Sequence, residues 1–433
     1  MGSEAIVSIV LGGSVVLLLL GAPVGPLLAF SSVVGIYLLI GNVQAATSLF
    51  LITGFDVASS VSYVVIPMFI FMGALASYTG IVQDLYDAAY KAVGRIAGGL
   101  AVATCLAAVA FGTVTGSSIS AASAMTKVAL PEMRKYGYHM RLSTGIIAIS
   151  GTFAMMIPPS LIMVFYGIVA QQSIGKLLIA GIIPGLVTAL VYCILILIRA
   201  FFNPGMAPPG PRFPFRDVLA SSIKASPFSL VLIVLIGGIL LGLWTPTEGS
   251  AAGVIVVALI GILKRNISFR QFFDASVDTV TTSATVLVLV MGSVLFGKFL
   301  ALSGVTVGLS RMIVSAELSS LQLFMVLIIF YIILGMFLEG ISILALTVPI
   351  VLPITTAAGW DPIWFGVMLV KLIEIGAVTP PVGLNLFAVK SVAPDVNTSD
   401  IIIGALPFWL CDIGVLFLLF YLPELVTFLP SFM

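Results

Sequence analysis

Long apolar runs separated by short polar turns make up most of this chain. The segments 177–198 and 228–244 contain no charged residue, and 401–422 contains only Asp412. A helix that crosses a bilayer needs about 20 such residues, each adding about 1.5 Å of length. The pattern therefore predicts an all-α polytopic membrane protein with about ten full spans and several shorter apolar segments.

One apolar stretch has the wrong length for a span. Residues 96–130 would form a helix of about 52 Å, although a bilayer core is about 30 Å thick, and two spans with a turn need more than about 40 residues. Glycines and hydroxyls replace bulky residues near its middle, in "GTVTGSS" from Gly112 to Ser118. By the positive-inside rule both ends are cytoplasmic, because they are flanked by Lys91, Arg95, Arg134, Lys135 and Arg141. We therefore expect a re-entrant helical hairpin at 96–130.

A second hairpin is predicted at 321–352, with its break at Glu339 and Gly340. Its flanks carry acidic residues instead of a basic cluster, so it enters from the opposite face. Each hairpin precedes an apolar helix that contains a proline pair: 143–170 is interrupted at "IPPS" and 362–390 at "TPPVGLN". Proline lacks the backbone N–H and clashes with the preceding turn, which predicts a broken helix in both places.

These features form an internal repeat with offsets of 222 to 224 residues. The matching positions are Gly73 and Gly297, Gly80 and Gly304, Gly116 and Gly340, Pro131 and Pro353, Pro158–Pro159 and Pro380–Pro381, and Pro184 and Pro407. A Pro-rich linker at 201–225 separates the two copies. Two repeats whose hairpins enter from opposite faces are typical of secondary transporters.

Composition and charge exclude other classes of function. The 433 residues are 61% hydrophobic and 8% charged, and the net charge of +1 argues against nucleic-acid binding. One histidine and three scattered cysteines give no cluster for a metal centre or a membrane-embedded enzyme. We predict a non-enzymatic protein without an organic cofactor.

The broken backbone suggests a binding site near the membrane midplane. Lipid cannot satisfy carbonyl oxygens that have lost their helical donor, whereas Na⁺ favours such oxygen ligands. The helix N-termini after each break carry partial positive charge, which suits an anionic substrate. The break residues expected at this site are Gly116, Glu339, Gly340, Pro159, Pro380 and Pro381, and the expected substrate contacts are Ser117, Ser118, Ser160 and Asn385.

Three stretches carry a family resemblance: "TGSSISAASAMTKVALPEMRKYGY", "SGTFAMMIPPSLIMVFYGIVAQQSIGKLLIAGIIPG" and "AVTPPVGLNLF". Nearly the whole chain resembles the large membrane subunit of tripartite ATP-independent periplasmic (TRAP) transporters. The resemblance implies Na⁺-driven uptake of an organic acid, such as sialic acid or a dicarboxylate, across the bacterial inner membrane. It also implies a periplasmic substrate-binding protein, a separate small membrane subunit and an elevator mechanism.

The resemblance further implies at least two transported Na⁺ ions. One sodium site would use backbone around Gly112, Thr115, Ala154, Ile157 and Pro158, and the other would use Gly335, Gly376, Thr379 and Val382. The expected division of the chain is a scaffold with an amphipathic arm (1–95), a first transport half (96–200), the linker (201–225), further scaffold (226–317), a second transport half (318–392) and a C-terminal helix (393–433).

Several alternatives stay open from the sequence. The chain could be a stand-alone Na⁺-coupled carboxylate transporter or a Na⁺/H⁺ transporter of the same broad architecture. Glu339 could act in transport or form a structural ion pair with Lys298. Lys371 and Glu374 are three residues apart and could pair on one helix face. The identity of the organic acid is not encoded in any motif.

Overall fold

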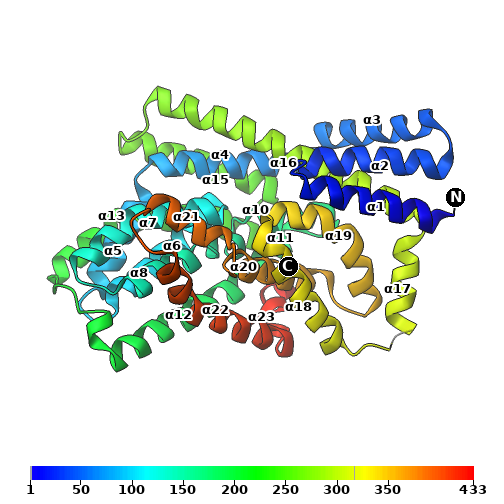
Figure 1. Cartoon of the computed structure of the whole chain (residues 1–433). Coiled ribbons are helices and arrows are strands. Elements are labelled where there is room, and N and C mark those ends of the chain that lie inside the picture. Colours follow the sequence, from blue (N-terminus) through cyan, green and yellow to red (C-terminus); the bar gives the residue numbers. More distant parts are fainter. Residues whose placement is uncertain (1, 316) are drawn as a thin grey trace.

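The computed structural model describes the backbone of residues 2–315 and 317–433 (Figure 1). The side chains of residues 3, 82, 113–115, 310, 313 and 314 lie outside the described part. Every regular element in the described residues is helical. In the described part of the chain, eight helices are long and apolar enough to cross a membrane, and the bent pair Met140–Met156 and Leu161–Val169 makes a ninth. The predicted all-α, multi-span class is confirmed.

The first repeat starts with a hairpin of apolar helices and ends before the Pro-rich linker. Its elements are α1 (Ser3–Leu19), α2 (Val24–Ile40), α3 (Val43–Ser59), a 3-10 turn η1 (Val61–Val64), α4 (Val65–Tyr78), α5 (Ile81–Val93), α6 (Gly99–Thr115), α7 (Ser118–Lys135), α8 (Met140–Ser150), α9 (Phe153–Met156), α10 (Leu161–Val169), α11 (Ile174–Ala180) and α12 (Ile182–Phe202).

The second repeat has the same order of elements. It comprises α13 (Phe215–Leu232), a π-helical segment (Ile233–Gly237), α14 (Gly238–Leu240), α15 (Pro246–Leu263), α16 (Phe269–Ser303), α17 (Val305–Ser315), α18 (Ser320–Phe337), α19 (Gly340–Ala357), α20 (Pro362–Ala377), α21 (Leu384–Val392) and α22 (Thr398–Tyr421), followed by α23 (Glu424–Thr427) and a 3-10 turn (Leu429–Phe432). Gly80 and Gly304 both adopt positive φ, 73° and 74°, before α5 and α17. The matched landmarks thus occupy matched turns.

The two hairpins turn at the breaks that the sequence predicts. Gly116 has φ 60° and ends α6, and the Ser117 hydroxyl then accepts from the Ser120 amide at 3.4 Å to cap α7. In the second hairpin α18 ends at Phe337, and the Glu339 carboxylate accepts from the Ile341 amide at 3.0 Å to cap α19. Each pair of helices is joined by only two residues.

The proline pairs interrupt helices as predicted. The Met140–Met156 segment and α10 meet at an angle of 41°, and Ser160 caps α10 by accepting from the Met163 amide at 3.3 Å. In the second repeat α20 ends at Ala377 and α21 begins at Leu384, after Gly383 with φ 60°. The breaks therefore come from Pro158–Pro159 and Pro380–Pro381 in both repeats.

Some predicted boundaries are wrong. Pro131 lies inside α7, which continues to Lys135, and Pro353 lies inside α19, which continues to Ala357. A single proline bends a membrane helix without ending it, because neighbouring groups satisfy the freed carbonyl. The linker is also shorter than 201–225: α12 runs to Phe202, and α13 starts at Phe215, directly after the last proline of the linker, Pro214.

The helices form two layers in Figure 1. The upper layer holds α1–α4, α15 and α16, and the hairpins and broken helices lie below it. The predicted amphipathic arm is α5, whose Asp84 forms an ion pair with Lys264 at the end of α15.

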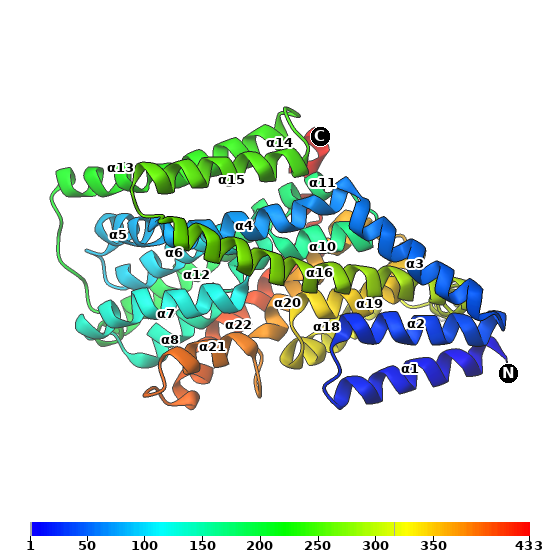
Figure 2. The same ribbon diagram turned by 90° about the horizontal axis from the view of Figure 1, so that it is seen from above.

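Most basic loops meet at one end of the molecule, seen at the left of Figure 2. Backbone bonds join them: Gly98 N–H donates to Ala207 O at 3.0 Å, and His139 N–H donates to Met206 O at 3.0 Å. Arg134 pairs with Asp395 at 2.6 Å and Arg141 pairs with Asp400 at 2.8 Å. We call this the basic end; by the positive-inside rule it faces the cytoplasm.

Candidate functional site

Two backbone crossings lie at the broken helices. At the first crossing, α6 passes α9 so closely that a Cβ on Gly112 would lie 2.7 Å from the Ala154 nitrogen. At the second, α18 passes α20, and a Cβ on Gly335 would lie 2.7 Å from the Gly376 Cα. Any side chain at Gly112, Gly335 or Gly376 would collide with backbone, so close approach explains these glycines.

The crossings are equivalent by the internal repeat. Gly112 and Gly335 are 223 residues apart, and Ala154 and Gly376 are 222 apart, within the offsets of the sequence landmarks. The structure therefore pairs residues that the resemblance assigned to the same sodium site. The backbone of Thr115 ends α6 at the first crossing, and its side chain lies outside the described residues.

The proline pairs remove backbone donors beside both crossings. Pro158 has no N–H for the Ala154 carbonyl, and Pro381 has none for the Ala377 carbonyl. Ser160 donates its hydroxyl to the Met155 carbonyl, which has lost its own donor to Pro159. Thus each crossing combines closely packed backbone with carbonyl oxygens that no i+4 amide can reach.

The Thr379 hydroxyl lies at the second crossing. It donates to the Ile375 carbonyl at 2.6 Å and accepts from Trp409 Nε1 at 2.8 Å. A hydroxyl oxygen has two lone pairs, so one acceptor position remains for a cation. The equivalent position in the first repeat is Ile157, at the same offset of 222, and it offers only its backbone carbonyl.

The two hairpin tips share a cavity of about 450 Å³, which we call the tip cavity. Its wall includes Gly116, Ser117 and Ser118 from the first tip and Glu339, Ile341 and Ser342 from the second. Helix α16 closes one side with Thr281, Thr282 and Thr285, and Met155, Leu161 and Ile162 add apolar surface. The N-termini of α7 and α19 thus reach one polar space.

The electrostatics of the tip cavity are uneven. Glu339 is the one charged side chain among the described residues that line it. The α7 end is capped by a neutral serine, whereas the α19 end is already compensated by a carboxylate. An anionic group is therefore better placed at the Ser117 end, where helix amides and hydroxyls are the donors.

The tip cavity adjoins a second cavity of about 710 Å³ beside the α1–α2 turn, with which it shares Thr285, Leu289 and Ser342. The tip cavity therefore extends from the hairpin tips to the α1–α2 turn.

The predicted substrate contacts separate into two groups. Ser117 and Ser118 line the tip cavity. Ser160 and Asn385 are fully buried and are not among the residues of that cavity. Within the described residues, neither side-chain polar atom of Asn385 has a hydrogen-bond partner.

Sequence reasoning missed the three threonines of α16. Their signal was the run "TVTTSAT" within an otherwise apolar helix, which places hydroxyls on the face toward the tips. The alternative ion pair between Glu339 and Lys298 is wrong for this structure. Glu339 bonds to its own helix, and Lys298 Nζ donates to Thr53 Oγ1 at 2.8 Å.

The predicted Lys371–Glu374 pair is confirmed, as part of a larger buried network. Lys371 Nζ lies 3.0 Å from Glu374 Oε2 and 2.7 Å from Asp412 Oδ1. Tyr192 donates to the other oxygen of Asp412 at 2.5 Å. These four side chains are almost completely buried, and they join α12, α20 and α22 behind the crossings.

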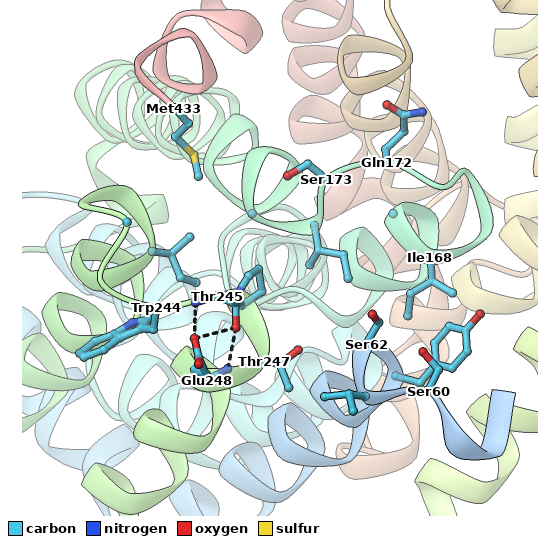
Figure 3. A pocket seen from close by; sticks show the side chains of 18 of the residues that line it. Ser60, Ser62, Ile168, Gln172, Ser173, Trp244, Thr245, Thr247, Glu248 and Met433 are labelled. Atoms are coloured by element: carbon cyan, nitrogen blue, oxygen red, sulfur yellow. Dashed lines mark hydrogen bonds between the residues drawn. The ribbon is translucent and has the colours of Figure 1, made fainter. Parts of the chain in front are cut away.

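A wide cleft of about 900 Å³ (Figure 3) lies where α15 begins, at the end of α13 and α15 that is away from the basic end (Figure 2). Hydroxyls, amides and the Glu248 carboxylate supply its polar surface, including Ser60, Ser62, Gln172 and Ser173. Thr245 and Glu248 form a reciprocal cap at the start of α15, shown by the dashed lines. We call this the polar cleft.

Comparison with known proteins decides the family. The model of the DctM component of tripartite ATP-independent periplasmic transporters matches residues 11–425. The chain belongs to this family. It is 32% identical over 380 residues to the C4-dicarboxylate TRAP transporter large permease protein of Pseudomonas aeruginosa, covering 88% of both chains.

Other TRAP large permease proteins are similar over most of their length. The sialic acid permease SiaM of Vibrio cholerae is 30% identical, with 84% of this chain and 85% of that protein covered. The ectoine/5-hydroxyectoine permease UehC of Ruegeria pomeroyi is 29% identical, with 96% of both covered. The Alcanivorax borkumensis YdaH transporter has a similar fold, with a TM-score of 0.64 at 13% identity, covering 88% of this chain and 89% of that one. This chain is accordingly a multi-pass membrane protein built as a TRAP large permease subunit.

Proposed function

We propose that this subunit carries an organic acid anion across the bacterial inner membrane by Na⁺ symport. The observation that carries the proposal is the repeated crossing, Gly112 with Ala154 and Gly335 with Gly376, next to one shared tip cavity. Two equivalent clusters of backbone oxygen suit two Na⁺ ions. The adjoining helix N-terminus and hydroxyls suit a carboxylate.

The proposed sodium ligands are those named from the sequence. The first site uses backbone around Gly112, Thr115, Ala154, Ile157 and Pro158. The second uses Gly335, Gly376, Thr379 and Val382. Binding there would tie a hairpin to a broken helix in each repeat, so ion occupancy would order both tips before the acid is carried.

We infer an elevator mechanism, in which the layer of hairpins and broken helices moves against α1–α4, α13, α15 and α16.

The relatives suggest the class of cargo and the partners. The named substrates of similar permeases are C4-dicarboxylates, sialic acid, isethionate and ectoine. All four carry a carboxylate or sulfonate. The fused permease of Oleidesulfovibrio alaskensis, named DctMQ, is covered over 57% of its length. We propose a separate small membrane subunit and a periplasmic binding protein as the partners of this chain.

The test is uptake into proteoliposomes that contain this chain and its small subunit. Succinate, N-acetylneuraminate, isethionate and ectoine are each supplied with and without the binding protein, and with and without an inward Na⁺ gradient. We expect uptake of one compound to need both. Uptake that needs Na⁺ but no binding protein would instead support the stand-alone carboxylate transporter. No Na⁺-dependent uptake of any of the four would count against the proposal.

A further inference from the structure

Lys298 is a cation without an acidic partner on an apolar helix. It lies on α16, five residues before the end of this 35-residue helix, and its side chain is half-buried. Its ammonium donates to the Thr53 hydroxyl of α3 at 2.8 Å. No carboxylate in the described residues forms an ion pair with it. An ammonium has three hydrogens, so two donors remain for another group.

The fold itself does not require a charge here. The equivalent residue of the first repeat, 224 positions earlier, is Ala74 on α4. Burying an unpaired ammonium in a membrane protein is unfavourable, and such residues are retained mainly where they serve an ion or substrate path. The contrast with Lys371, which has two buried carboxylate partners, makes Lys298 exceptional.

Lys298 lines a cavity of about 430 Å³ between α16, α10 and α19. Among the described residues of this wall, Lys298 is the charged one, and Ser293 and Gln171 are polar. The cavity shares Tyr63, Ile168 and Gln171 with the polar cleft, which lies away from the basic end. The ammonium therefore borders a polar path from the side opposite the cytoplasm.

The tip cavity and the Lys298 cavity use successive parts of one helix. Thr281 to Leu289 of α16 line the first, and Ser293 to Ala301 line the second. Lys298 follows Thr285 by 13 residues, which is about 20 Å along a helix axis. The two spaces therefore differ in depth along α16 as well as in charge, because the tip cavity carries Glu339 and the other carries Lys298.

We propose that Lys298 forms an anion site on the uptake side, where its ammonium binds the carboxylate or sulfonate of the incoming acid before the acid reaches the hairpin tips. This inference rests on the proposed function for the direction of transport and the nature of the cargo. The lysine supplies an attractive charge beside the polar cleft, so the anion is held first at Lys298. The Lys298 cavity and the tip cavity share no lining residue, so the acid reaches the tips only when the layer of hairpins moves.

A structural role for Lys298 makes a different prediction. If the ammonium only ties α16 to α3, then removing its acceptor should cause the same defect as removing the ammonium. Thr53→Val deletes the acceptor and keeps the charge, whereas Lys298→Met deletes the charge and keeps the apolar stem. Lys298→Arg keeps the charge with a different shape.

The first test asks whether the ammonium is reached from the uptake side. Proteoliposomes of known orientation, containing the chain with its small subunit, are treated from outside with sulfo-NHS acetate, a membrane-impermeant reagent. Acetylation of Lys298 is read by peptide mass spectrometry. We expect labelling from the uptake side, reduced at least threefold by millimolar isethionate or succinate. Labelling only from the cytoplasmic side, or labelling that neither anion reduces, would overturn the proposal.

The second test uses whichever compound wild-type complexes take up with Na⁺. We expect Lys298→Met to raise its half-saturating concentration about tenfold, with Lys298→Arg and Thr53→Val within about threefold of wild type. Equal defects in Lys298→Met and Thr53→Val would show a structural tie and reject the anion site. Absence of wild-type uptake would count against the proposed function, and the labelling result would still decide the role of Lys298.

Discussion

The two crossings share a backbone design but differ in how deeply their residues are buried. At the first, every residue from Ile157 to Ser160 is buried. At the second, Thr379 is buried, Pro380 and Val382 are half-buried, and Pro381 is exposed. Duplication has thus preserved the close approach of a hairpin to a broken helix, while the surroundings have sealed one copy and left the other open. We expect an ion at the second crossing to exchange more readily with solution.

The buried network links the crossings to one another. Tyr192 packs against Phe153, which precedes Ala154, with ring centroids 5.5 Å apart. Lys371 and Glu374 lie on α20 shortly before Gly376. The same hydrogen-bonded cluster therefore supports the sealed crossing through an aromatic ring and the open crossing through its own helix.

The largest effect is expected from filling the open crossing. Gly376→Leu should abolish uptake, because even a Cβ there would lie 2.7 Å from the Gly335 Cα. Gly414→Leu is the matched control, since a Cβ at that helical glycine meets nothing within 4 Å. Uptake is measured alongside the amount of protein inserted in the membrane. Normal uptake by Gly376→Leu would remove the crossing from the site.

The next effect concerns the network between the crossings. Lys371→Met should lower the free energy of unfolding by about 3–5 kcal/mol, because it leaves two buried carboxylates without their cation. Thermal unfolding of the detergent-purified protein measures this change. Arg134→Met removes a surface ion pair and should cost at most about 1 kcal/mol. Similar losses in the two variants would mean that the buried network does not brace the crossings.

A smaller and more selective effect is expected at the Thr379 hydroxyl, which the first crossing lacks. Thr379→Val should raise the Na⁺ concentration for half-maximal uptake about three- to tenfold, since one ligand is lost. Thr126→Val is a fair comparison, because that buried hydroxyl only bonds within its own helix, to Ala122 O at 2.7 Å. Na⁺ activation curves that coincide for wild type and Thr379→Val would reject a ligand role.

The sequence predicts those features of the fold that hydrophobic periodicity and the spacing of glycine and proline determine locally. Glycine at the first tip and the two proline pairs have strong local effects on backbone, so both hairpin turns and both broken helices could be located. The same repeat offset would also relate Gly112 to Gly335, but the landmarks paired from the sequence were others, and this equivalence emerged from the structure. The hairpin ends predicted just before Pro131 and Pro353 are wrong, because a single proline is tolerated inside a membrane helix when neighbouring groups satisfy the freed carbonyl.

Other features depend on packing between distant segments and carry no local signal. Asp412 joins Lys371 across 41 residues and Tyr192 across 220. Lys298 donates a hydrogen bond to Thr53, 245 residues away in the sequence, and forms no ion pair with Glu339. The threonines of α16 become part of the site only because both tips meet that helix. Side-chain partners across a fold of this size require the tertiary arrangement.

The smallest effects should have opposite signs at the two tips: a variant of the first tip should raise the half-saturating concentration of the acid, and a variant of the second should lower it. Ser117→Ala removes a hydroxyl from the tip cavity and should raise the half-saturating concentration of the acid about two- to tenfold, the usual net value of one hydrogen bond. Glu339→Gln removes the negative charge from the other tip and keeps a cap oxygen, so it should lower that concentration for an anion. Ser120→Ala, one turn from the tip, controls for the helix. Parallel changes in Ser117→Ala and Glu339→Gln would show that the tips act alike, and the anion would then have no preferred end.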